Sequence, residues 1–434
     1  MLDLIIKNGL CYIDKDLKNQ DIAIRDGKIL KIGKIEEEAK EIFDAKGLTV
    51  LPGCIDTQTH FREPGSTDTE DLNSGSRAAI AGGITSVFEM PNTNPPTSSK
   101  KEFRRKLDLA KNRMYCNYAF YFGATADNAK ELADLKNLEG CCGIKLFAGS
   151  STGNLLVADE KDIETVFENS SKVVAVHSED EEILNINKKL IKDGDVHSHP
   201  IWRSEECAIS STRRIVRIAE RYKKKAHVLH ITTRQEIDFL SQHKGNISFE
   251  ITPQHLTIYA PDCYNKLGTY AQMNPPLRDK SHYDRLWYAV KNNLNDTIGS
   301  DHAPHLKENK EKNYPNSPSG MPGVQTLMPV MLNHINDGKL TLEQLINSVC
   351  ENPVKIFGIK NKGFIKESFD ADFTIVDINK KIQIKNENIE SKCGWSPFDG
   401  YEFKGTPVST IIAGKIKMKD GKILGDPEGK PLIF

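Results

Sequence analysis

Three polar side chains that could hold a metal ion and an anion stand at alternate positions after an apolar stretch. Gln58, His60 and Arg62 follow the mostly apolar run 48–55. Side chains two apart on a strand share a face, so we expect all three to point into one cavity. Burying three polar groups costs free energy unless partners satisfy them, and a metal ion with an anionic substrate would do so. The strand is therefore predicted to open an active site.

Further residues that can bind a metal or move a proton lie on, or at the ends of, other predicted strands. They are Lys145, His177, His230 and Asp301. A single histidine at the end of an apolar strand is more often a core residue than a ligand. Several strands that end this way favour a metal site, because the C-terminal ends of parallel barrel strands form the catalytic rim. With His60, these residues are the predicted metal ligands.

Lys145 needs a separate explanation, because most lysines lie in solvent. It stands in the apolar stretch 143–147, where a buried ammonium would be costly. Burial lowers the pKa of a lysine, and the uncharged amine can react with CO2 to give a carbamate. A carbamate is an anion that can bridge two metal ions.

The segment 56–65 reads Asp-x-x-x-His-x-Arg-Glu-Pro-Gly and resembles the first-strand signature of the dihydroorotases, within the cyclic-amidohydrolase superfamily. The resemblance covers nearly the whole chain, since the segments 370–373 and 396–400 are similar to the C-terminal unit of these enzymes. It implies a zinc enzyme that interconverts N-carbamoyl-L-aspartate and dihydroorotate in pyrimidine synthesis.

The resemblance also implies a role for each candidate metal ligand. Its sequence context makes Lys145 the carbamylated bridge, and His177 and His230 match the histidines of the second metal. Asp301 matches the aspartate that touches metal and transfers the proton, and we see no other candidate for that transfer. One or two zinc ions per chain are expected.

A second set of residues is expected to hold the substrate. The planar guanidinium of Arg62 suits a carboxylate, and with Asn92 it resembles the family's holders of the dihydroorotate carboxylate. Asn274, within the segment 273–278, resembles the ring-contacting loop, and His305 a further substrate contact. The ordinary alternatives are a surface salt bridge for Arg62 and a turn for Asn92. Because both residues occur together at the spacing that the family has, the substrate role is favoured.

Gln58 departs from the family, which usually has a histidine at this position. A neutral amide is a weak zinc ligand beside imidazole. Three outcomes stay open: two metals with an amide-ligated first ion, an active one-metal enzyme that uses His177, His230 and the carbamate, or a barrel that binds little metal and works as a partner protein. Because the other ligand candidates are all present, an active enzyme is favoured.

Short apolar strands alternate with amphipathic helical stretches through residues 51–362, which predicts a (β/α)8 barrel. The first strand is followed by seven more, at 85–90, 116–120, 143–147, 173–177, 226–230, 247–251 and 297–301. Residues 1–50 and 363–434 read as short strands with hairpin turns, so a small β-sandwich domain built from both termini is expected. The charged segment 306–320 is either a solvated mobile connection or, because it follows His305, a gate over the site.

Composition limits the class of partner. A chain of 434 residues with a formal net charge of −1 has no electrostatic signature of nucleic-acid or anionic-membrane binding, so a small-molecule substrate is expected. The N-terminus lacks a signal-peptide core, no run is long enough to span a membrane, and nine scattered cysteines favour reduced thiols. These features predict a cytoplasmic protein.

Two other functions stay open. Another cyclic amidase, such as an allantoinase or dihydropyrimidinase, is disfavoured by Arg62, because those substrates lack the ring carboxylate. A non-catalytic dihydroorotase-like partner of aspartate transcarbamoylase is favoured by Gln58 alone. Homo-oligomerisation is also left open.

Overall fold

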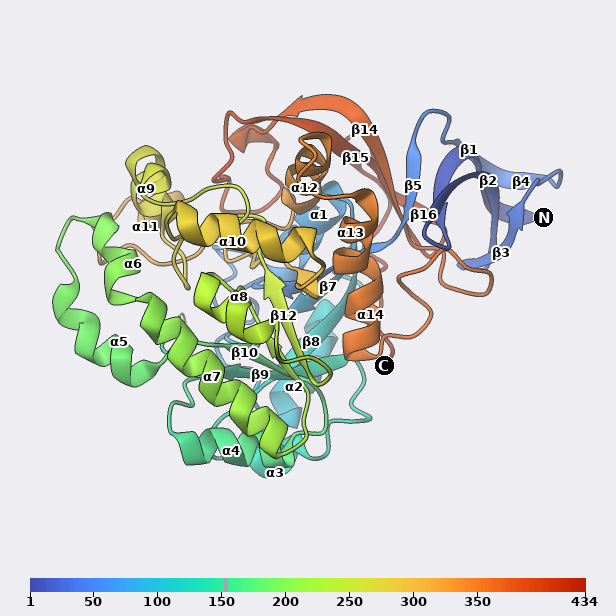
Figure 1. Ribbon diagram of the computed structural model, residues 1–434. Helices are drawn as coiled ribbons and strands as arrows, with labels where there is room; N and C mark the ends of the chain where they lie inside the picture. Colours follow the sequence, from blue (N-terminus) through green and yellow to red (C-terminus); the bar gives the residue numbers. More distant parts are fainter. Residues whose placement is uncertain (152–154) are drawn as a thin grey trace.

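The computed structural model of the protein describes residues 1–151 and 155–434. In Figure 1 a barrel surrounded by helices fills the left of the view, and a curled sheet that contains the N-terminus lies at the right. None of the described helices has the length and apolar character needed to cross a membrane.

Eight parallel strands form the barrel, in the same order along the sheet as along the chain. They are β6 (Cys54–Thr59), β7 (Ile84–Glu89), β8 (Asn117–Gly123), β9 (Cys141–Phe147), β10 (Val174–His177), β11 (Ala226–Val228), β12 (Ile247–Ile251) and β13 (Thr297–Ile298). The barrel closes where Thr59 pairs with His302, just beyond β13. The predicted barrel is confirmed, and each predicted strand is present with bounds that shift by a few residues.

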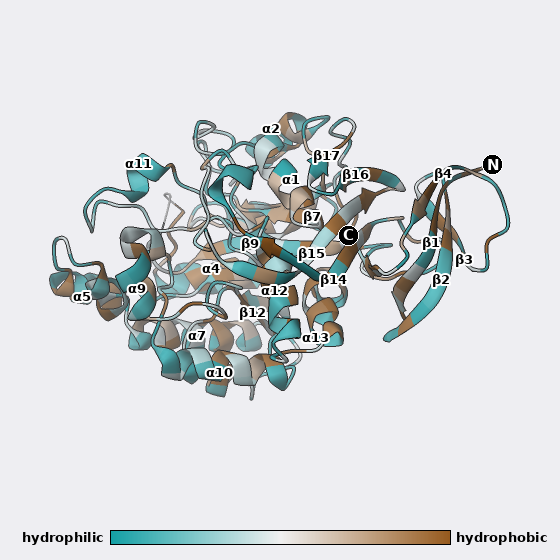
Figure 2. Ribbon diagram, turned by 90° about the horizontal axis from the view of Figure 1, so that it is seen from above, coloured by the Kyte–Doolittle hydropathy of each residue, from teal (hydrophilic) through white to brown (hydrophobic). Residues whose placement is uncertain are grey.

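Helices surround the barrel between these strands. They are α1 (Leu72–Ala81), α2 (Lys100–Ala110), α3 (Ala129–Leu132), α4 (Glu160–Asn169), α5 (Glu181–Asn187), α6 (His199–Trp202), α7 (Glu205–Arg221), α8 (Arg234–Leu240), α9 (Asp262–Leu267), α10 (Lys280–Lys291), α11 (Lys307–Lys310), α12 (Leu327–Asn336), α13 (Leu342–Ile346) and α14 (Asn352–Phe357). Teal and brown alternate along α7 and α10 in Figure 2, as expected for helices that bury one side only. The hydroxyl of Ser204 accepts from the amide of Cys207 and caps α7.

Aromatic side chains fill one end of the barrel interior. Phe88 on β7 packs edge to face on Phe357 of α14, with ring centres 4.9 Å apart, and Tyr121 on β8 packs against both rings. This aromatic layer closes the N-terminal end of the barrel. The polar residues of the site are therefore confined to the other end.

Strands from both ends of the chain share one sheet. Its order is β17-β16-β15-β14-β5-β1-β2-β3, and β4 also pairs with β1. The bounds are β1 (Leu2–Ile13), β2 (Asp16–Arg25), β3 (Lys28–Gly33), β4 (Ala39–Asp44), β5 (Thr49–Pro52), β14 (Phe373–Gln383), β15 (Glu402–Ile412), β16 (Lys415–Lys419) and β17 (Lys422–Ile423). The antiparallel pairing of β5 with β14 joins the two termini and confirms the predicted terminal domain. Its residue bounds, 1–50 and 363–434, stay a prediction.

The segment 306–320 is packed against the barrel, although its composition suggests a solvated connection. Lys310, Tyr314 and Ser317 are buried. The ammonium of Lys310 donates to the carbonyl oxygens of Gln272, Pro318 and Gly320 at 3.0, 2.8 and 3.1 Å. Charged residues are thus used here to fix the backbone of a loop, and the gating role stays a prediction.

Candidate active site

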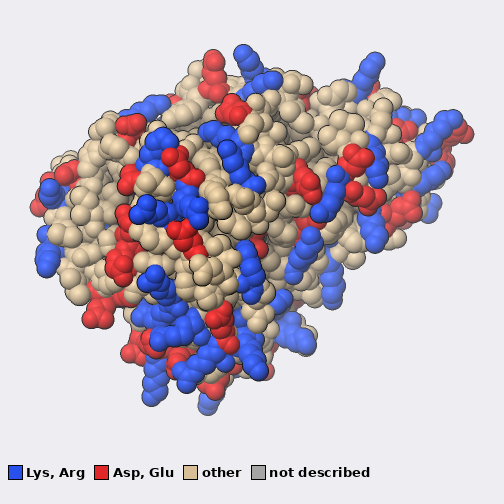
Figure 3. All heavy atoms as spheres, viewed as in Figure 1, with Lys and Arg blue, Asp and Glu red and all other residues tan. Residues whose placement is uncertain are grey.

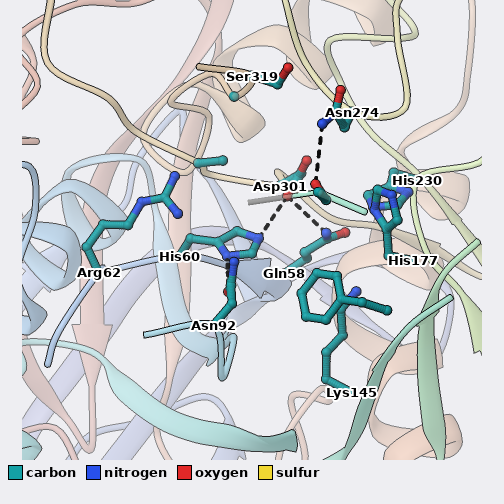
Figure 4. A pocket seen from close by; sticks show the side chains of 14 residues that line it. Gln58, His60, Arg62, Asn92, Lys145, His177, His230, Asn274, Asp301 and Ser319 are labelled. Carbon is teal, nitrogen blue, oxygen red and sulfur yellow. Dashed lines mark hydrogen bonds and ion pairs between the residues drawn. The ribbon is translucent and has the colours of Figure 1, made fainter. Parts of the chain in front are cut away.

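Residues from seven of the eight barrel strands or the loops that follow them meet in one pocket at the C-terminal end of the barrel (Figure 4). The described residues that line it are Gln58, His60, Arg62, Asn92, Lys145, Phe147, Ser151, His177, His230, Asn274, Asp301, Ala303, Ser319 and Gly320. All the predicted metal ligands are among them. So are three of the four predicted substrate contacts.

The route by which Gln58, His60 and Arg62 reach the pocket differs from the prediction. We expected one strand to carry all three, but β6 ends at Thr59 and Arg62 has a φ of +61°. The chain turns after the strand, because the amide of His60 donates to the carbonyl of His302 at 2.8 Å and ties it to the end of the barrel. The prediction of a shared pocket is therefore right, and the prediction of strand geometry through Arg62 is wrong.

One side of the pocket is built around Asp301. Its Oδ1 accepts from the amide nitrogen of Gln58 at 2.9 Å and lies 3.2 Å from Nε2 of His60. His60 Nδ1 lies 2.8 Å from the amide oxygen of Asn92, so that nitrogen carries the proton and the Nε2 lone pair faces Asp301. Burial raises the pKa of Asp301 to about 7, while burial and the charges of Arg62 and Lys145 hold the pKa of His60 well below its usual value. A proton or a cation between Asp301 and His60 would satisfy both acceptors.

The other side of the pocket pairs two histidines. His177 Nδ1 and His230 Nε2 lie 3.1 Å apart. The remaining nitrogen of His177, Nε2, lies 2.8 Å from Glu179, which also accepts from Nε of Arg203 at 3.1 Å. This carboxylate fixes the proton on Nε2 and leaves the Nδ1 lone pair directed toward His230, which is how a carboxylate orients a metal-binding histidine.

Lys145 lies between these two sides and is 1% exposed. Its Nζ stands 4.4 Å from the ring centre of Phe147, and among the described residues no oxygen accepts a hydrogen bond from it. Burial lowers its pKa to about 7. A substantial fraction of the amine is therefore uncharged near neutral pH, which is the state that reacts with CO2.

Three pocket residues have strained backbones. Arg62, His230 and Asp301 have φ values of +61°, +39° and +43°, a region that residues with a side chain rarely adopt. Strain of this kind costs about 1–3 kcal/mol per residue and persists where surrounding contacts enforce it, often at functional sites. These three are the pocket-lining members of the fourteen described non-glycine residues that have a positive φ.

The predicted substrate contacts occupy the outer part of the pocket. Nε and Nη2 of Arg62 donate to the carbonyl of Pro304 at 3.2 and 3.1 Å, so the backbone fixes the guanidinium. Asn274 donates to Ser151 at 3.4 Å across the pocket. Among the described residues His305 does not line the pocket, and its Nε2 lies 3.3 Å from Nη2 of Arg62 and 2.9 Å from the carbonyl of Ser319. His305 thus stands behind Arg62 in this structure.

Several residues that support the site were not anticipated. Glu179 follows His177 by two positions, and that spacing was a signal available in the sequence. Arg203 and the buried ion pair of Glu89 with Lys106 come from distant segments. Glu89 accepts from the amide of Phe61 at 3.2 Å and so holds the turn that carries His60 and Arg62. Only the fold brings these groups together.

Neighbouring histidines have structural roles. His302 Nδ1 accepts from the amide of Gly323 at 3.1 Å, which puts its proton on Nε2, 3.3 Å from Glu70. A second cluster of possible ligands, Glu205, Asp279 and His282, lies outside the pocket. His282 Nδ1 accepts from the amide of Arg234 at 3.0 Å, so its Nε2 proton faces Glu205 at 2.9 Å and no lone pair is left for a metal.

The pocket residues fit a metal ion. Nδ1 of His177 and Nε2 of His230 lie 3.1 Å apart, and both Nδ1 of His230 and the amide oxygen of Gln58 are buried with no hydrogen-bond partner among the described residues. Buried acceptors without a partner are costly and are satisfied by a cation. Among the described residues, no three histidines, cysteines or carboxylates of the pocket meet within 4.8 Å, so the donors form two pairs with Lys145 between them.

Comparison with known proteins agrees with this geometry. A model of the amidohydrolase family matches residues 49–417. The chain is 35% identical to a dihydroorotase from Pyrococcus furiosus, covering 99% of this chain and 96% of that protein, and 31% identical to a dihydroorotase from Methanothermobacter thermautotrophicus, covering 98% and 96%. Among solved structures, the L-hydantoinase (dihydropyrimidinase) from Arthrobacter aurescens superposes with a TM-score of 0.95 at 28% identity over 100% of both chains.

The chain belongs to the amidohydrolase family. The match spans the whole barrel and the strands β5, β14 and β15 of the terminal sheet, so membership rests on more than the motifs of the pocket. The predicted resemblance and the predicted metal-dependent cyclic amide hydrolase are confirmed. A dihydropyrimidinase from Brevibacillus agri has the same fold, with a TM-score of 0.90 at 26% identity over 99% of this chain and 97% of that one. The pocket lies at the C-terminal rim of the barrel, where TIM-barrel enzymes have their active sites.

Proposed function

We propose that this amidohydrolase is a zinc-dependent dihydroorotase that interconverts N-carbamoyl-L-aspartate and dihydroorotate in pyrimidine synthesis. The observation that carries the proposal is the buried guanidinium of Arg62 in the wall of the pocket, on the same side as Asp301. A fixed, buried cation recognises a substrate carboxylate, and dihydroorotate has one on its ring. The full-length similarity to dihydroorotases supports the same assignment.

We assign the metal to His177, His230, a carbamate on Lys145 and Asp301, and we assign His60 to a first metal ion where one is bound. Zinc, when bound, lowers the pKa of water to about 7 and polarises a carbonyl group. Lys145 contributes an anion once its uncharged amine has reacted with CO2, which its lowered pKa of about 7 favours. Glu179 and Arg203 keep His177 in the tautomer that leaves Nδ1 free to coordinate.

We assign proton transfer to Asp301. It accepts the proton of the attacking water and returns it to the ring nitrogen that leaves. Its pKa, raised to about 7 by burial, suits both directions of transfer near neutral pH. Hydrogen bonds from Gln58 and contact with His60 hold the carboxylate in place. The rotation of Asp301 away from the pocket is thereby prevented.

We assign substrate binding to Arg62 and Asn92 for the carboxylate, Asn274 for the ring, and His305 as a further contact. Arg62 is held by Pro304 and stands 3.3 Å from His305, so His305 acts on substrate through the guanidinium or after a small side-chain movement. The pocket wall beside His305 is closed by Ser319 and Gly320, from the packed segment 306–320.

Gln58 favours an enzyme that works with one metal ion. Its amide nitrogen is engaged by Asp301, so it acts on the carboxylate as a hydrogen-bond donor, where an imidazole would offer a lone pair to a first metal. The pair formed by His177 and His230 has no such substitution. A single ion held there, with Lys145 and Asp301, is the arrangement we propose.

The remaining assignments concern the cellular compartment of the protein and its protein partners. Nine free, buried cysteines support a reducing compartment, and we propose the cytoplasm. Association with aspartate transcarbamoylase and homo-oligomerisation stay open as parts of this proposal. No feature of the pocket requires either of them.

The test is a substrate comparison with purified protein supplied with zinc and bicarbonate. Ring opening of dihydroorotate, dihydrouracil, hydantoin and allantoin is measured together with ring closure of N-carbamoyl-L-aspartate. We expect kcat/KM for dihydroorotate to exceed that for the uncharged rings by about tenfold or more, since a charge-assisted bond contributes on the order of 1.5–3 kcal/mol. Zinc bound per chain is measured on the same sample.

Two outcomes would replace the proposal. Faster turnover of dihydrouracil or hydantoin would make the protein a dihydropyrimidinase, the alternative that the hydantoinase-like fold favours. A metal-loaded protein that turns over none of these substrates alone, but stabilises or activates aspartate transcarbamoylase, would support the partner function that Gln58 favours.

A further inference from the structure

A large hollow lies at the opposite end of the barrel from the active-site pocket. Its walls come from the segments that enter β9, β10 and β11 and from the C-terminal end of α14. Cys142 at the start of β9 and Val173 directly before β10 are part of it, so it opens at the N-terminal ends of the strands. Its volume is about 680 Å³. We refer to it as the basal cavity.

Seven lysines line the basal cavity, and among the described residues no aspartate or glutamate does. The lysines are Lys136, Lys172, Lys223, Lys224, Lys225, Lys355 and Lys360. Lys355 forms an ion pair with Glu351 at 3.0 Å. Each of the other six has no described carboxylate within 4.0 Å of its ammonium group. The cavity therefore holds an excess of positive charge that the carboxylate side chains of the described residues do not neutralise.

This concentration does not follow from the overall composition. The chain has 59 lysines and arginines and 60 aspartates and glutamates, so a surface region of average composition would carry both basic and acidic side chains. In Figure 3 blue side chains, with some red ones among them, gather at the lower end of the view, where α4 and the end of α7 lie in Figure 1. The segment that follows α7 supplies Lys223, Lys224 and Lys225 to the cavity.

Two of the ammonium groups are fixed at the cavity wall. Nζ of Lys224 donates to the carbonyl of Ser170 at 2.7 Å, and Nζ of Lys172 stands 4.8 Å from the ring centre of Phe434. Ser170 and Phe434 also line the cavity. The floor is apolar, because Phe357 and Val173 are buried beneath it. Phe357 belongs to the aromatic layer that closes the barrel, so this floor is rigid.

We propose that the basal cavity binds a small molecule that carries an oligophosphate group. Positive charge in a concave site over a low-dielectric floor attracts anions more strongly than the same charge on a convex surface. Lysines act as point charges for phosphate oxygens. The volume lies within the range of roughly 300–1,000 Å³ typical of small-molecule sites, and the apolar floor can contact a ring. The proposal does not depend on the reaction at the other end of the barrel.

Isothermal titration calorimetry of the full chain, in low salt without divalent cations, tests the proposal. The probes are inorganic tripolyphosphate, ATP and adenosine, which separate free oligophosphate from a nucleotide that carries one. We expect one site per chain for tripolyphosphate or ATP, no binding of adenosine at the same concentrations, and weaker binding as salt is raised. The triple variant Lys136→Gln, Lys172→Gln, Lys225→Gln should bind about tenfold or more weakly.

A matched variant controls for total charge. Lys188→Gln, Lys189→Gln, Lys192→Gln also removes three charges, from exposed positions that do not line the cavity, and it should bind as the unmodified protein does. Both variants change surface side chains, and equal melting temperatures confirm their folding. The proposal fails if neither phosphate probe binds, or if both variants lose affinity equally. It also fails if heparin or single-stranded DNA displaces the probes at far lower concentration, because the lysines would then serve a macromolecular polyanion.

Discussion

Replacing Arg62 with methionine removes the charge that distinguishes dihydroorotate from uncharged cyclic amides. The methionine side chain retains most of the apolar volume of the arginine, so the pocket wall is kept. Nε and Nη2 of Arg62 are used on the carbonyl of Pro304, which leaves the rest of the guanidinium for the substrate. The substitution therefore deletes the substrate contact and also leaves one buried carbonyl without its donor.

The two losses have different signatures. A charge-assisted hydrogen bond contributes on the order of 1.5–3 kcal/mol, so its loss lowers kcat/KM for dihydroorotate by roughly 10- to 150-fold. The unpaired carbonyl of Pro304 costs about 1–3 kcal/mol of stability and affects every substrate alike. The ratio of kcat/KM for dihydroorotate to that for dihydrouracil cancels the structural loss and isolates the carboxylate contact.

The assay measures ring opening of both substrates by Arg62→Met and by the unmodified enzyme. Arg77→Met is the control, since Arg77 donates to Glu390 at 2.8 Å and does not line the pocket. We expect the substrate ratio to fall in Arg62→Met and to stay constant in Arg77→Met. An equal loss on both substrates in Arg62→Met would refute the carboxylate role and make Arg62 a structural residue.

Four further predictions concern the pocket and the loop beside it. Asp301→Asn should keep its melting temperature and lose most turnover, and activity within a few-fold of the unmodified enzyme would contradict its role in proton transfer. Lys145→Ala should lose bound zinc and activity, with partial recovery on adding short carboxylic acids and zinc; full activity without additives would exclude the carbamate. Gln58→His should raise bound zinc toward two per chain, because imidazole replaces a neutral amide. An unchanged zinc content would show that a feature other than Gln58 limits the affinity of the first metal site. Lys310→Met should lower the melting temperature, because three carbonyls lose their common donor, those of Gln272, Pro318 and Gly320. The same variant should raise KM for dihydroorotate by a larger factor than it lowers kcat. Equal changes in KM and kcat would argue that Lys310 does not position the loop beside the pocket.

The barrel could be predicted from the sequence because its signals are local. Each strand is a short apolar run bounded by polar or turn residues, and each helix is amphipathic, so periodicity identifies both. The terminal sheet was predictable for the same reason, from hairpin turns such as that between β2 and β3. Pairing of β5 with β14, which lie more than 300 residues apart in the chain, rests on tertiary contact. The sequence predicted that both termini form one domain, but it did not predict which strands pair.

The sequence alone indicated which residues on the barrel strands meet in the candidate site, because the order of barrel strands fixes which strand ends meet. Each of five residues lies on a predicted strand or at its end, and all five line one pocket: His60, Lys145, His177, His230 and Asp301. Their number and chemical types already indicated a metal site, and the resemblance to the dihydroorotases implied hydrolysis of a cyclic amide.

Tertiary structure alone decided how these residues are oriented and held. The tautomer of His177 depends on Glu179 and Arg203, the left-handed backbone of Arg62 depends on a turn beyond β6, and the buried position of Lys310 depends on three carbonyls from two loops. Hydrogen bonds between distant segments and the burial of charge are properties of the assembled interior, where low dielectric makes each contact strong and each missing contact costly. The amino-acid sequence specifies the residue types, and the packed interior determines the protonation states and the orientations of their side chains.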